Sequence, residues 1–205
     1  MTSLGQTTGG SPGSVTGLVL AGGRSSRFGS DKLAAPYEGV PLVHHAVMRL
    51  AEVCDDVVVV LAPDARVDLP PGVRTTHDPT EGEGPLAGLH QGLLAAVRSD
   101  AVVVAGGDMP ELQPAVLRTM LAVLADARVD AVALDDGDGA RPLPCVLRTW
   151  PAADAVHTLL HAGRRRLRDV LDALRTAVID APTWTALDPE RRTLRDVDTP
   201  EDLAR

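Results

Sequence analysis

Short runs of apolar residues alternate with longer stretches of helical periodicity, and this alternation constrains the fold more than any other feature of the chain. Three continuous apolar runs have the length and character of strands buried on both faces: 15–21, 56–62 and 101–105. The stretches between them repeat apolar residues every three or four positions, beginning after Pro41, at Leu86 and at Val116. Parallel strands need such long crossover connections. We therefore predict an α/β fold with a mostly parallel central sheet and helices on both of its faces.

The second half of the chain adds a short antiparallel element to this pattern. A strand at 130–134 leads through the turn 135–139 into an extended segment at 142–149, which we expect to pair antiparallel. The remaining predicted elements are a short strand at 73–76, helices at 151–161 and 164–174, a strand at 177–180 and a short helix after Pro200. No repeat or linker divides residues 15–205, so we predict one domain, preceded by a flexible tail at 1–14 that is rich in Gly, Ser and Thr.

Composition excludes several classes of protein. With 44% hydrophobic and 23% charged residues among 205, the chain has enough apolar surface for one compact core. No apolar run approaches the roughly 18 to 20 residues that span a bilayer, and residues 1–14 lack the pattern of a secretory signal. A net charge of −8 and 2% aromatic residues disfavour a nucleic-acid partner. We expect a cytoplasmic protein that binds neither membrane nor nucleic acid.

Three sets of residues invite a disulfide or metal interpretation that the sequence does not favour. Cys54 and Cys145 lie far apart without a CxxC neighbour, so we predict two free core thiols. The acidic run 135–139 lacks the later bidentate glutamate of a calcium loop and predicts a solvated turn. His157 and His161 have the i, i+4 spacing of a helical metal pair, but no third ligand is evident. We predict that both histidines lie on an exposed helix face.

A glycine pair follows the first predicted strand and opens a segment with concentrated positive charge. Residues 20–32 read LAGGRSSRFGSDK. Glycines directly after a buried strand let the backbone approach a ligand and present N–H groups to an anion. The spacing matches neither the GxGxxG dinucleotide fingerprint nor the GxxxxGK[ST] phosphate loop. On an otherwise acidic chain, three cations within this segment predict a loop that binds a polyphosphate: Arg24, Arg27 and Lys32.

Lys32 is the only lysine among the 20 basic residues of the chain. Where arginine fills every other basic position, a single lysine indicates a place that requires a compact ammonium group. We predict that Lys32 binds phosphate, and the alternative is a solvated surface lysine. Arg27 is predicted to share this role, with a structural salt bridge as its alternative.

The glycine segment resembles LAGGxSxRMGxDK, the signature of the molybdenum cofactor guanylyltransferases within the nucleotidyltransferase superfamily. Three further segments agree in order with that family: Asp78 followed by GPLAG at 84–88, GDMP at 107–110 and DVDTPEDL at 196–203. The resemblance extends from about residue 15 to the end. It implies a single Rossmann-like domain that transfers GMP from GTP to molybdenum-bound molybdopterin and releases pyrophosphate, with Mg²⁺ as the cofactor.

Two aspartates have the chemistry of metal ligands. Asp108 comes directly after the third long apolar run, at the carboxyl end of a predicted parallel strand, where open α/β sheets bind ligands. A carboxylate there can hold Mg²⁺ against a nucleoside triphosphate, and the alternative is a cap for the helix after Pro110. Asp198 is the predicted second ligand, again with a helix cap as the alternative. Asp78, after the short strand, is predicted to position the nucleotide or its ribose.

The resemblance also assigns backbone positions to the nucleotide. The second glycine of LAGG, together with GPLAG, is similar to members that transfer GMP, whereas LAAG is more typical of those that transfer CMP. The family pattern therefore implies that the glycine segment reads the base edge and that the GPLAG segment binds the nucleotide: Leu20, Ala21, Gly22 and Gly23, with Gly84, Pro85 and Leu86.

Some positions depart from the family or allow two interpretations. The terminal NxN of the family is Asp196-Val197-Asp198 here, and strand end 60–62 lacks an asparagine that some members use on the nucleotide. The added negative charge is expected to tighten Mg²⁺ binding and weaken binding of the acceptor phosphate. The densest cationic cluster consists of Arg164, Arg165, Arg166 and Arg168. It resembles a GxRRL-like segment of the family, which implies contact with the acceptor's phosphate and pterin. A solvated helix face is an equally compatible interpretation.

Two other functions stay open on the sequence alone. One is an enzyme that uses CTP for a molybdopterin relative, or a nucleotide for a different phosphorylated acceptor. The other is a non-catalytic adaptor that binds nucleotide through the glycine loop but has lost turnover. The expected partners are GTP and molybdenum-bound molybdopterin as substrates, with transient contact to proteins that deliver the acceptor or receive the product.

Overall fold

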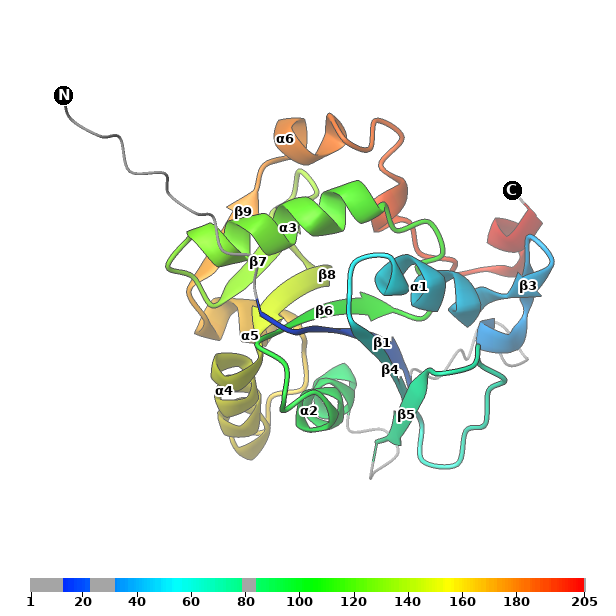
Figure 1. Ribbon diagram of the computed structural model, residues 1–205, viewed down its shortest axis with the longest axis horizontal. Helices are drawn as coiled ribbons and strands as arrows, with labels where there is room; N and C mark the ends of the chain where they lie inside the picture. Colours follow the sequence, from blue (N-terminus) through cyan, green and yellow to red (C-terminus); the bar gives the residue numbers. More distant parts are fainter. Residues whose placement is uncertain (1–12, 23–31, 79–83, 205) are drawn as a thin grey trace.

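The computed structural model describes residues 13–22, 32–78 and 84–204, and its centre is a seven-stranded sheet of order β5-β4-β1-β6-β8-β7-β9 (Figure 1). In chain order the strands are β1 (Val15–Ala21), β4 (Asp56–Leu61), β5 (Arg74–His77), β6 (Ala101–Gly106), β7 (Ala131–Asp135), β8 (Ala140–Arg148) and β9 (Thr176–Ile179). All of them run parallel except β8, which pairs antiparallel with both β6 and β7. The predicted sheet with its antiparallel element is confirmed.

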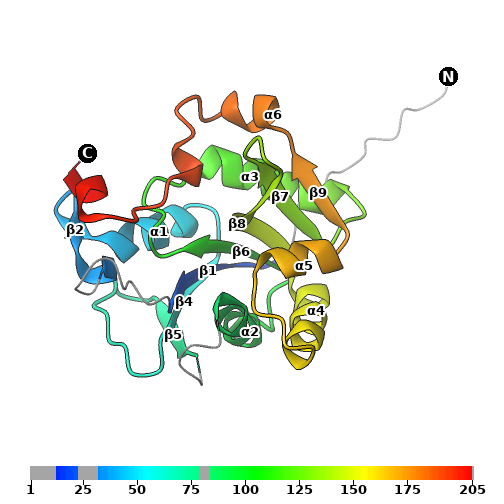
Figure 2. The ribbon, with the colours of Figure 1, turned by 180° about the vertical axis from the view of Figure 1, so that it is seen from behind.

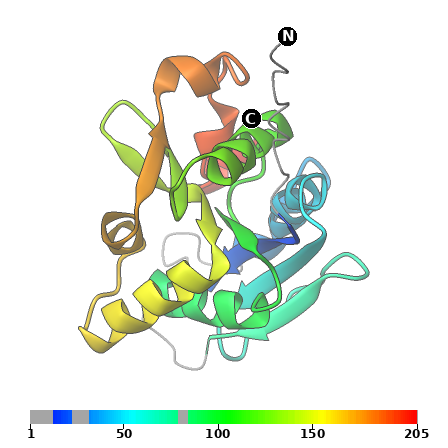
Figure 3. The same cartoon turned by 60° about the vertical axis from the view of Figure 1, so that its left-hand side comes forward.

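Helices cover both faces of the sheet, as Figures 1 and 2 show. One face carries α1 (Leu42–Ala51), α3 (Pro114–Asp126) and α6 (Ala181–Thr185), and the other carries α2 (Pro85–Ala95), α4 (Thr149–His161) and α5 (Arg168–Ala173). Strand β1 illustrates why its sequence is apolar throughout. Val15 and Val19 pack into the cluster beneath α1 and α3, whereas Leu18 packs into the cluster beneath α2. Helices α2 and α4 lie side by side (Figure 3).

The strand order places a topological switch point at β1. The chain passes from β1 outward to β4 and β5, and then crosses to β6 on the opposite side of β1. Leu20 is in register with Gly106, and Gly107 N donates a hydrogen bond to Leu20 O at 3.0 Å. The carboxyl ends of β1 and β6 therefore lie together. Open α/β sheets bind their ligands at such a point.

Several short elements lie outside the alternating pattern, and the sequence analysis did not predict them. Strands β2 (Pro36–Tyr37) and β3 (Val40–Pro41) form a separate two-stranded hairpin, and short 3₁₀ helices occur as η1 (Lys32–Ala34) and η2 (Arg192–Leu194). The last predicted helix is 3₁₀ as well, η3 (Pro200–Ala204). Helix α6 depends on a distant contact, because the buried indole of Trp184 donates to Asp135 O at 2.8 Å.

The predicted helix 164–174 begins later than expected. Gly163 has φ +74°, the left-handed conformation that ends α4, and α5 starts only at Arg168. Arg164 donates two hydrogen bonds to the carboxylate of Asp169, at 3.0 and 2.6 Å. This ion pair holds residues 164–167 as a connection, so the expectation of one continuous helix is wrong.

Other local expectations are met. Cys145 is buried, Cys54 is partly buried, and both are free thiols whose pKa burial raises to about 12. The acidic segment 135–139 is the turn between β7 and β8, where Asp135 Oδ1 accepts from Gly137 N at 2.9 Å. Of the predicted tail, only residues 13 and 14 are described. None of the described helices is long and apolar enough to cross a membrane.

Gly17 in the middle of β1 permits the close packing of α1 on the sheet. A Cβ atom there would lie 2.9 Å from Leu50 Cβ, an atom that cannot move without its helix. We expect Gly17→Ala to lower the free energy of unfolding by about 1–3 kcal/mol, measured by urea denaturation. Gly88→Ala on α2 is the matched control. There the added Cβ meets only ordinary contacts, and alanine should stabilise the helix by about 1 kcal/mol. Unchanged stability of Gly17→Ala would contradict this account of the packing.

Candidate active site

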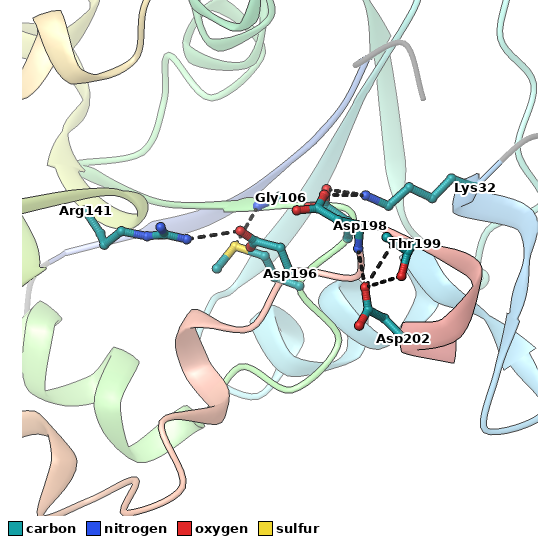
Figure 4. A network of polar contacts seen from close by, with 9 residues as sticks. Lys32, Gly106, Arg141, Asp196, Asp198, Thr199 and Asp202 are labelled. Atoms are coloured by element: carbon teal, nitrogen blue, oxygen red, sulfur yellow. Dashed lines mark hydrogen bonds and ion pairs between the residues drawn. The ribbon is translucent and has the colours of Figure 1, made fainter. Parts of the chain in front are cut away.

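Charged side chains from four segments that are distant in sequence meet at the carboxyl end of β6 (Figure 4). Asp108 lies two residues after β6, and Lys32 begins η1. Asp196 and Asp198 come from the segment before η3, and Arg141 comes from β8. The sequence analysis predicted Lys32, Asp108 and Asp198 for one site, and the fold brings all three into contact.

The ammonium group of Lys32 lies between two carboxylates. Its Nζ atom is 2.9 Å from Asp108 Oδ2 and 3.3 Å from Asp198 Oδ1. Lys32 is only 8% exposed, whereas the side chain of Asp198 is 67% exposed. Lysine is almost never buried unless it is paired, and here two partners share one positive charge. The alternative of a solvated surface lysine is therefore wrong.

The backbone around Asp198 is held by contacts that leave its carboxylate turned toward Lys32. Val197 N donates to Asp108 O at 2.9 Å, which attaches the terminal segment to the end of β6. Asp202 Oδ2 accepts from Asp198 N at 3.2 Å, from Thr199 N at 3.0 Å and from Thr199 Oγ1 at 2.9 Å. Asp202, not Asp198, thus accepts from the backbone at the start of η3, contrary to the cap alternative.

The cap alternative for Asp108 also fails, and two glycines explain the position of its carboxylate. Helix α3 begins at Pro114, well beyond Asp108. A Cβ atom on Gly106 would lie 2.4 Å from Asp108 Oδ1, and one on Gly107 would lie 3.0 Å from Leu33 Cδ2. Side chains at these two positions would push the carboxylate and η1 away from β6.

Asp196 adds a third carboxylate to the group. Arg141 donates to Asp196 Oδ2 at 3.0 Å, and the Asp196 side chain is 33% exposed. Burial, followed by the negative charge of Asp108, raises the pKa of Asp196 to about 6 even though Arg141 opposes the shift. Lys32 and Arg141 are thus the two cations that contact these three carboxylates among the described residues. The site favours a further cation.

The other predicted nucleotide positions near β1 lie along the same edge of the sheet. Gly22 follows β1, and a Cβ atom on it would be 3.6 Å from Ala62 N. Asp78 N donates to Leu61 O at 2.9 Å, so Asp78 lies at the end of β4. Leu20 and Ala21 are the last residues of β1. Gly23, Arg24 and Arg27 are outside the described residues.

The GPLAG segment forms the amino end of α2. Gly84 has φ +83°, a left-handed conformation that favours glycine, and a Cβ atom there would lie 3.2 Å from Arg165 O. Pro85 is exposed and is the first residue of α2, whereas Leu86 is completely buried in the core. A ligand at this helix end would therefore meet Gly84 and Pro85 but not the Leu86 side chain.

The arginine cluster largely supports the connection between α4 and α5. Arg164 pairs with Asp169, and Arg168 Nη2 donates to Ala140 O at 2.7 Å. Arg165 Nη1 donates to Arg164 O at 2.8 Å. These contacts give three of the four guanidinium groups a structural role, and a role toward the acceptor stays a prediction.

The histidine pair lies on an exposed helix face, as predicted. His157 and His161 are exposed on α4, with ring centroids 4.4 Å apart, and His90 of α2 lies 6.0 Å from His157. Burial, together with these neighbours, lowers the pKa of His90. Within residues 13–22, 32–78 and 84–204, no group of three or more His, Cys, Asp or Glu side chains is arranged to hold a metal ion.

Comparison with known proteins agrees with this geometry. The profile of the MobA-like NTP transferase domain matches residues 17–178. A probable molybdenum cofactor guanylyltransferase from Chloroflexus aggregans is 35% identical over 92% of this chain and 91% of its own, and one from Natronomonas pharaonis is 35% identical over 94% and 96%. The structure of molybdopterin-guanine dinucleotide biosynthesis protein A from Archaeoglobus fulgidus, 24% identical, shares the fold with a TM-score of 0.76 and covers 93% of this chain and 95% of its own.

A mostly parallel sheet with a carboxylate and lysine cluster at its switch point, together with these matches, defines a nucleotidyltransferase. Within that class, the chain belongs to the MobA-like NTP transferase family, and the two relatives above are named probable molybdenum cofactor guanylyltransferases. The resemblance noted from the sequence motifs is confirmed.

Two residues of the site were missed as functional candidates by the sequence analysis. Arg141 gave no signal, because its partner Asp196 lies 55 residues away. Asp202 did carry a signal, since a carboxylate shortly after an Asp-Thr-Pro turn is well placed to accept from the turn's N–H groups.

We expect Asp196→Asn to stabilise the protein at pH 8 by about 1–2 kcal/mol, with no difference near pH 3.5. The folded-state pKa of Asp196 lies above its ordinary value, so the ionised carboxylate opposes folding, and this cost appears as pH rises through about 4 to 6. The magnitude is reduced for solvent screening because the side chain is one third exposed. Urea denaturation in EDTA across this pH range measures the effect. Equal stability of both proteins at pH 8 would contradict the assigned electrostatics.

Proposed function

We propose that this chain transfers GMP from GTP to the terminal phosphate of molybdenum-bound molybdopterin and that Mg²⁺ held by Asp108 and Asp198 supports the transfer. An acceptor phosphate oxygen forms the new bond to the α-phosphorus, the bond from that phosphorus to the β-phosphate bridging oxygen breaks, and pyrophosphate leaves. The observation that carries the proposal is the Lys32, Asp108 and Asp198 cluster at the switch point, in a chain of the guanylyltransferase family.

The residues at the end of β6 fit a magnesium ion. Mg²⁺ uses one or two protein carboxylates and completes its shell with water and phosphate oxygens. Asp108 and Asp198 are two such carboxylates, and their oxygens already converge on one positive charge, the Lys32 ammonium. When bound, the ion would neutralise negative charge that develops on the phosphates.

The chain's own residues would then position and stabilise the reacting groups. The Lys32 ammonium would bind the departing pyrophosphate, with Arg27 as a second cation from the glycine loop. Backbone groups of Leu20, Ala21, Gly22 and Gly23 would read the base edge, and Asp78 the ribose or the nucleotide. The amino end of α2 at Gly84 and Pro85 lies at the same edge of the sheet, where a helix N-terminus favours an anion.

The first test is Asp108→Asn, which keeps the shape of the side chain and removes its charge. Because Asp108 lies outside the core and caps no helix, we expect a folded protein with a loss of Mg²⁺-dependent transfer of about 10²-fold or more. Pyrophosphate release from GTP and the molybdenum cofactor measures the rate, and thermal unfolding verifies the fold. Glu52→Gln on the surface after α1 is a control that should transfer normally. A folded Asp108→Asn protein with wild-type turnover would remove Asp108 from the mechanism.

The second test separates guanylyl transfer from the cytidylyl alternative. With Mg²⁺ present, GTP at 100 times its dissociation constant should stabilise the protein by about 2.7 kcal/mol, and CTP at the same concentration should stabilise it less. Thermal shift with the four nucleoside triphosphates measures this order. A larger shift with CTP would favour the cytidylyl reaction. A clear GTP shift without pyrophosphate release would favour the non-catalytic adaptor.

A further inference from the structure

We propose that Lys32 competes with the divalent cation for Asp108 and Asp198, and that it yields these carboxylates when a triphosphate supplies other oxygens for its ammonium. The inference rests on the proposed metal role of the two aspartates. In this proposal Lys32 has two roles. It binds phosphate, and before the metal binds it holds the two carboxylates in position.

The ammonium of Lys32 occupies the position between the two carboxylates. Lys32 Nζ is 2.9 Å from Asp108 Oδ2 and 3.3 Å from Asp198 Oδ1, which are hydrogen-bond distances to both partners. A metal ion that binds oxygens of both side chains would have to enter the space that the ammonium group occupies. Because like charges repel, a divalent ion bound to these same two oxygens would displace the ammonium.

Burial makes the exchange depend on a new partner for the lysine. Lys32 is 8% exposed, so an ammonium that leaves the carboxylates without reaching water or another anion would be unpaired and desolvated. Phosphate oxygens of a nucleotide bound to the same metal ion provide that anion. Metal and nucleotide should therefore bind cooperatively, and the metal alone should bind weakly.

The competition also gives a physical reason for the lone lysine. Lysine carries a compact charge on a flexible four-carbon stem, so its ammonium can move between a carboxylate pair and a phosphate by rotation of its own side chain. Arginine presents a planar fork that pairs two oxygens at once and fits a single point between two carboxylates poorly. The 19 other basic positions of the chain are all arginine.

The test compares binding of free Mn²⁺ by the wild type and by Lys32→Met, without nucleotide. Electron paramagnetic resonance measures the binding, because protein-bound Mn²⁺ loses the sharp signal of the free ion. If the ammonium and the metal compete, removal of the ammonium should tighten Mn²⁺ binding by about tenfold or more. Equal or weaker binding by Lys32→Met would overturn the proposal.

Two further variants control for charge and folding. Arg49→Met on α1 removes one positive charge from an exposed pair with Glu52 and should leave Mn²⁺ affinity at the wild-type value. Lys32→Gln keeps a polar donor without the charge, and it should bind Mn²⁺ more tightly than the wild type if Lys32→Met does not fold. Equal gains in Arg49→Met and the Lys32 variants would mean a nonspecific charge effect and would overturn the competition.

Guanylyl transfer by the same wild-type preparation separates this inference from the proposed function. Normal Mg²⁺-dependent transfer without a gain in Mn²⁺ affinity for either Lys32 variant overturns the competition and leaves the proposed function intact. Absence of transfer, with no Mn²⁺ binding by any variant, overturns the metal role of Asp108 and Asp198 and the competition with it.

A measurement on the unaltered chain tests the same exchange. Lys32 and the α-amino group are its two amines, so an acylating reagent followed by mass spectrometry reports each separately. At a Mn²⁺ concentration where resonance shows the ion bound, labelling of Lys32 should rise several-fold relative to the α-amino group. Addition of GTP should lower the labelling of Lys32 again, because the phosphate groups of GTP bind its ammonium. If bound Mn²⁺ leaves the labelling of Lys32 unchanged, the proposal is overturned.

Discussion

The parallel pairing of β1 with β6 determines where the charged groups of the site meet. Leu20 and Gly106 are in register, and the hydrogen bond from Gly107 to Leu20 continues the pairing past the end of β6. The chain after β1 and Asp108 after β6 therefore emerge at one edge, at the switch point of the sheet. Val197 then bonds to the backbone of Asp108 and brings in Asp198. Each later contact of the site depends on this first pairing.

Carboxylates outnumber the cations that contact them at this edge, among the residues that the structure describes. Three carboxylates face Lys32 and Arg141, and one of them, Asp196, has a raised pKa because it is largely buried and lies near the negative charge of Asp108. Buried charges are stable only when they are paired, so the arrangement favours an additional cation.

The sequence predicted the long elements well, because each one buries an apolar face large enough to be read from periodicity. Strand β1 has the same bounds in the sequence prediction and in the structure, and helix α1 begins after Pro41 as predicted. The short elements escaped prediction because long-range contacts stabilise them. Helix α6 depends on the bond from Trp184 to Asp135, and the late start of α5 depends on the pair between Arg164 and Asp169.

The sequence by itself determined the class of fold, through apolar periodicity, and the family, through four ordered motifs, and it singled out candidate site residues such as the single lysine. Only the tertiary structure decided how those residues are paired. Lys32 lies 76 residues from Asp108 and 166 residues from Asp198, yet its ammonium touches both, and Arg141 neutralises an aspartate that no local pattern connects to it. Distances between groups so remote in sequence are set by sheet order and packing, which local propensity does not encode.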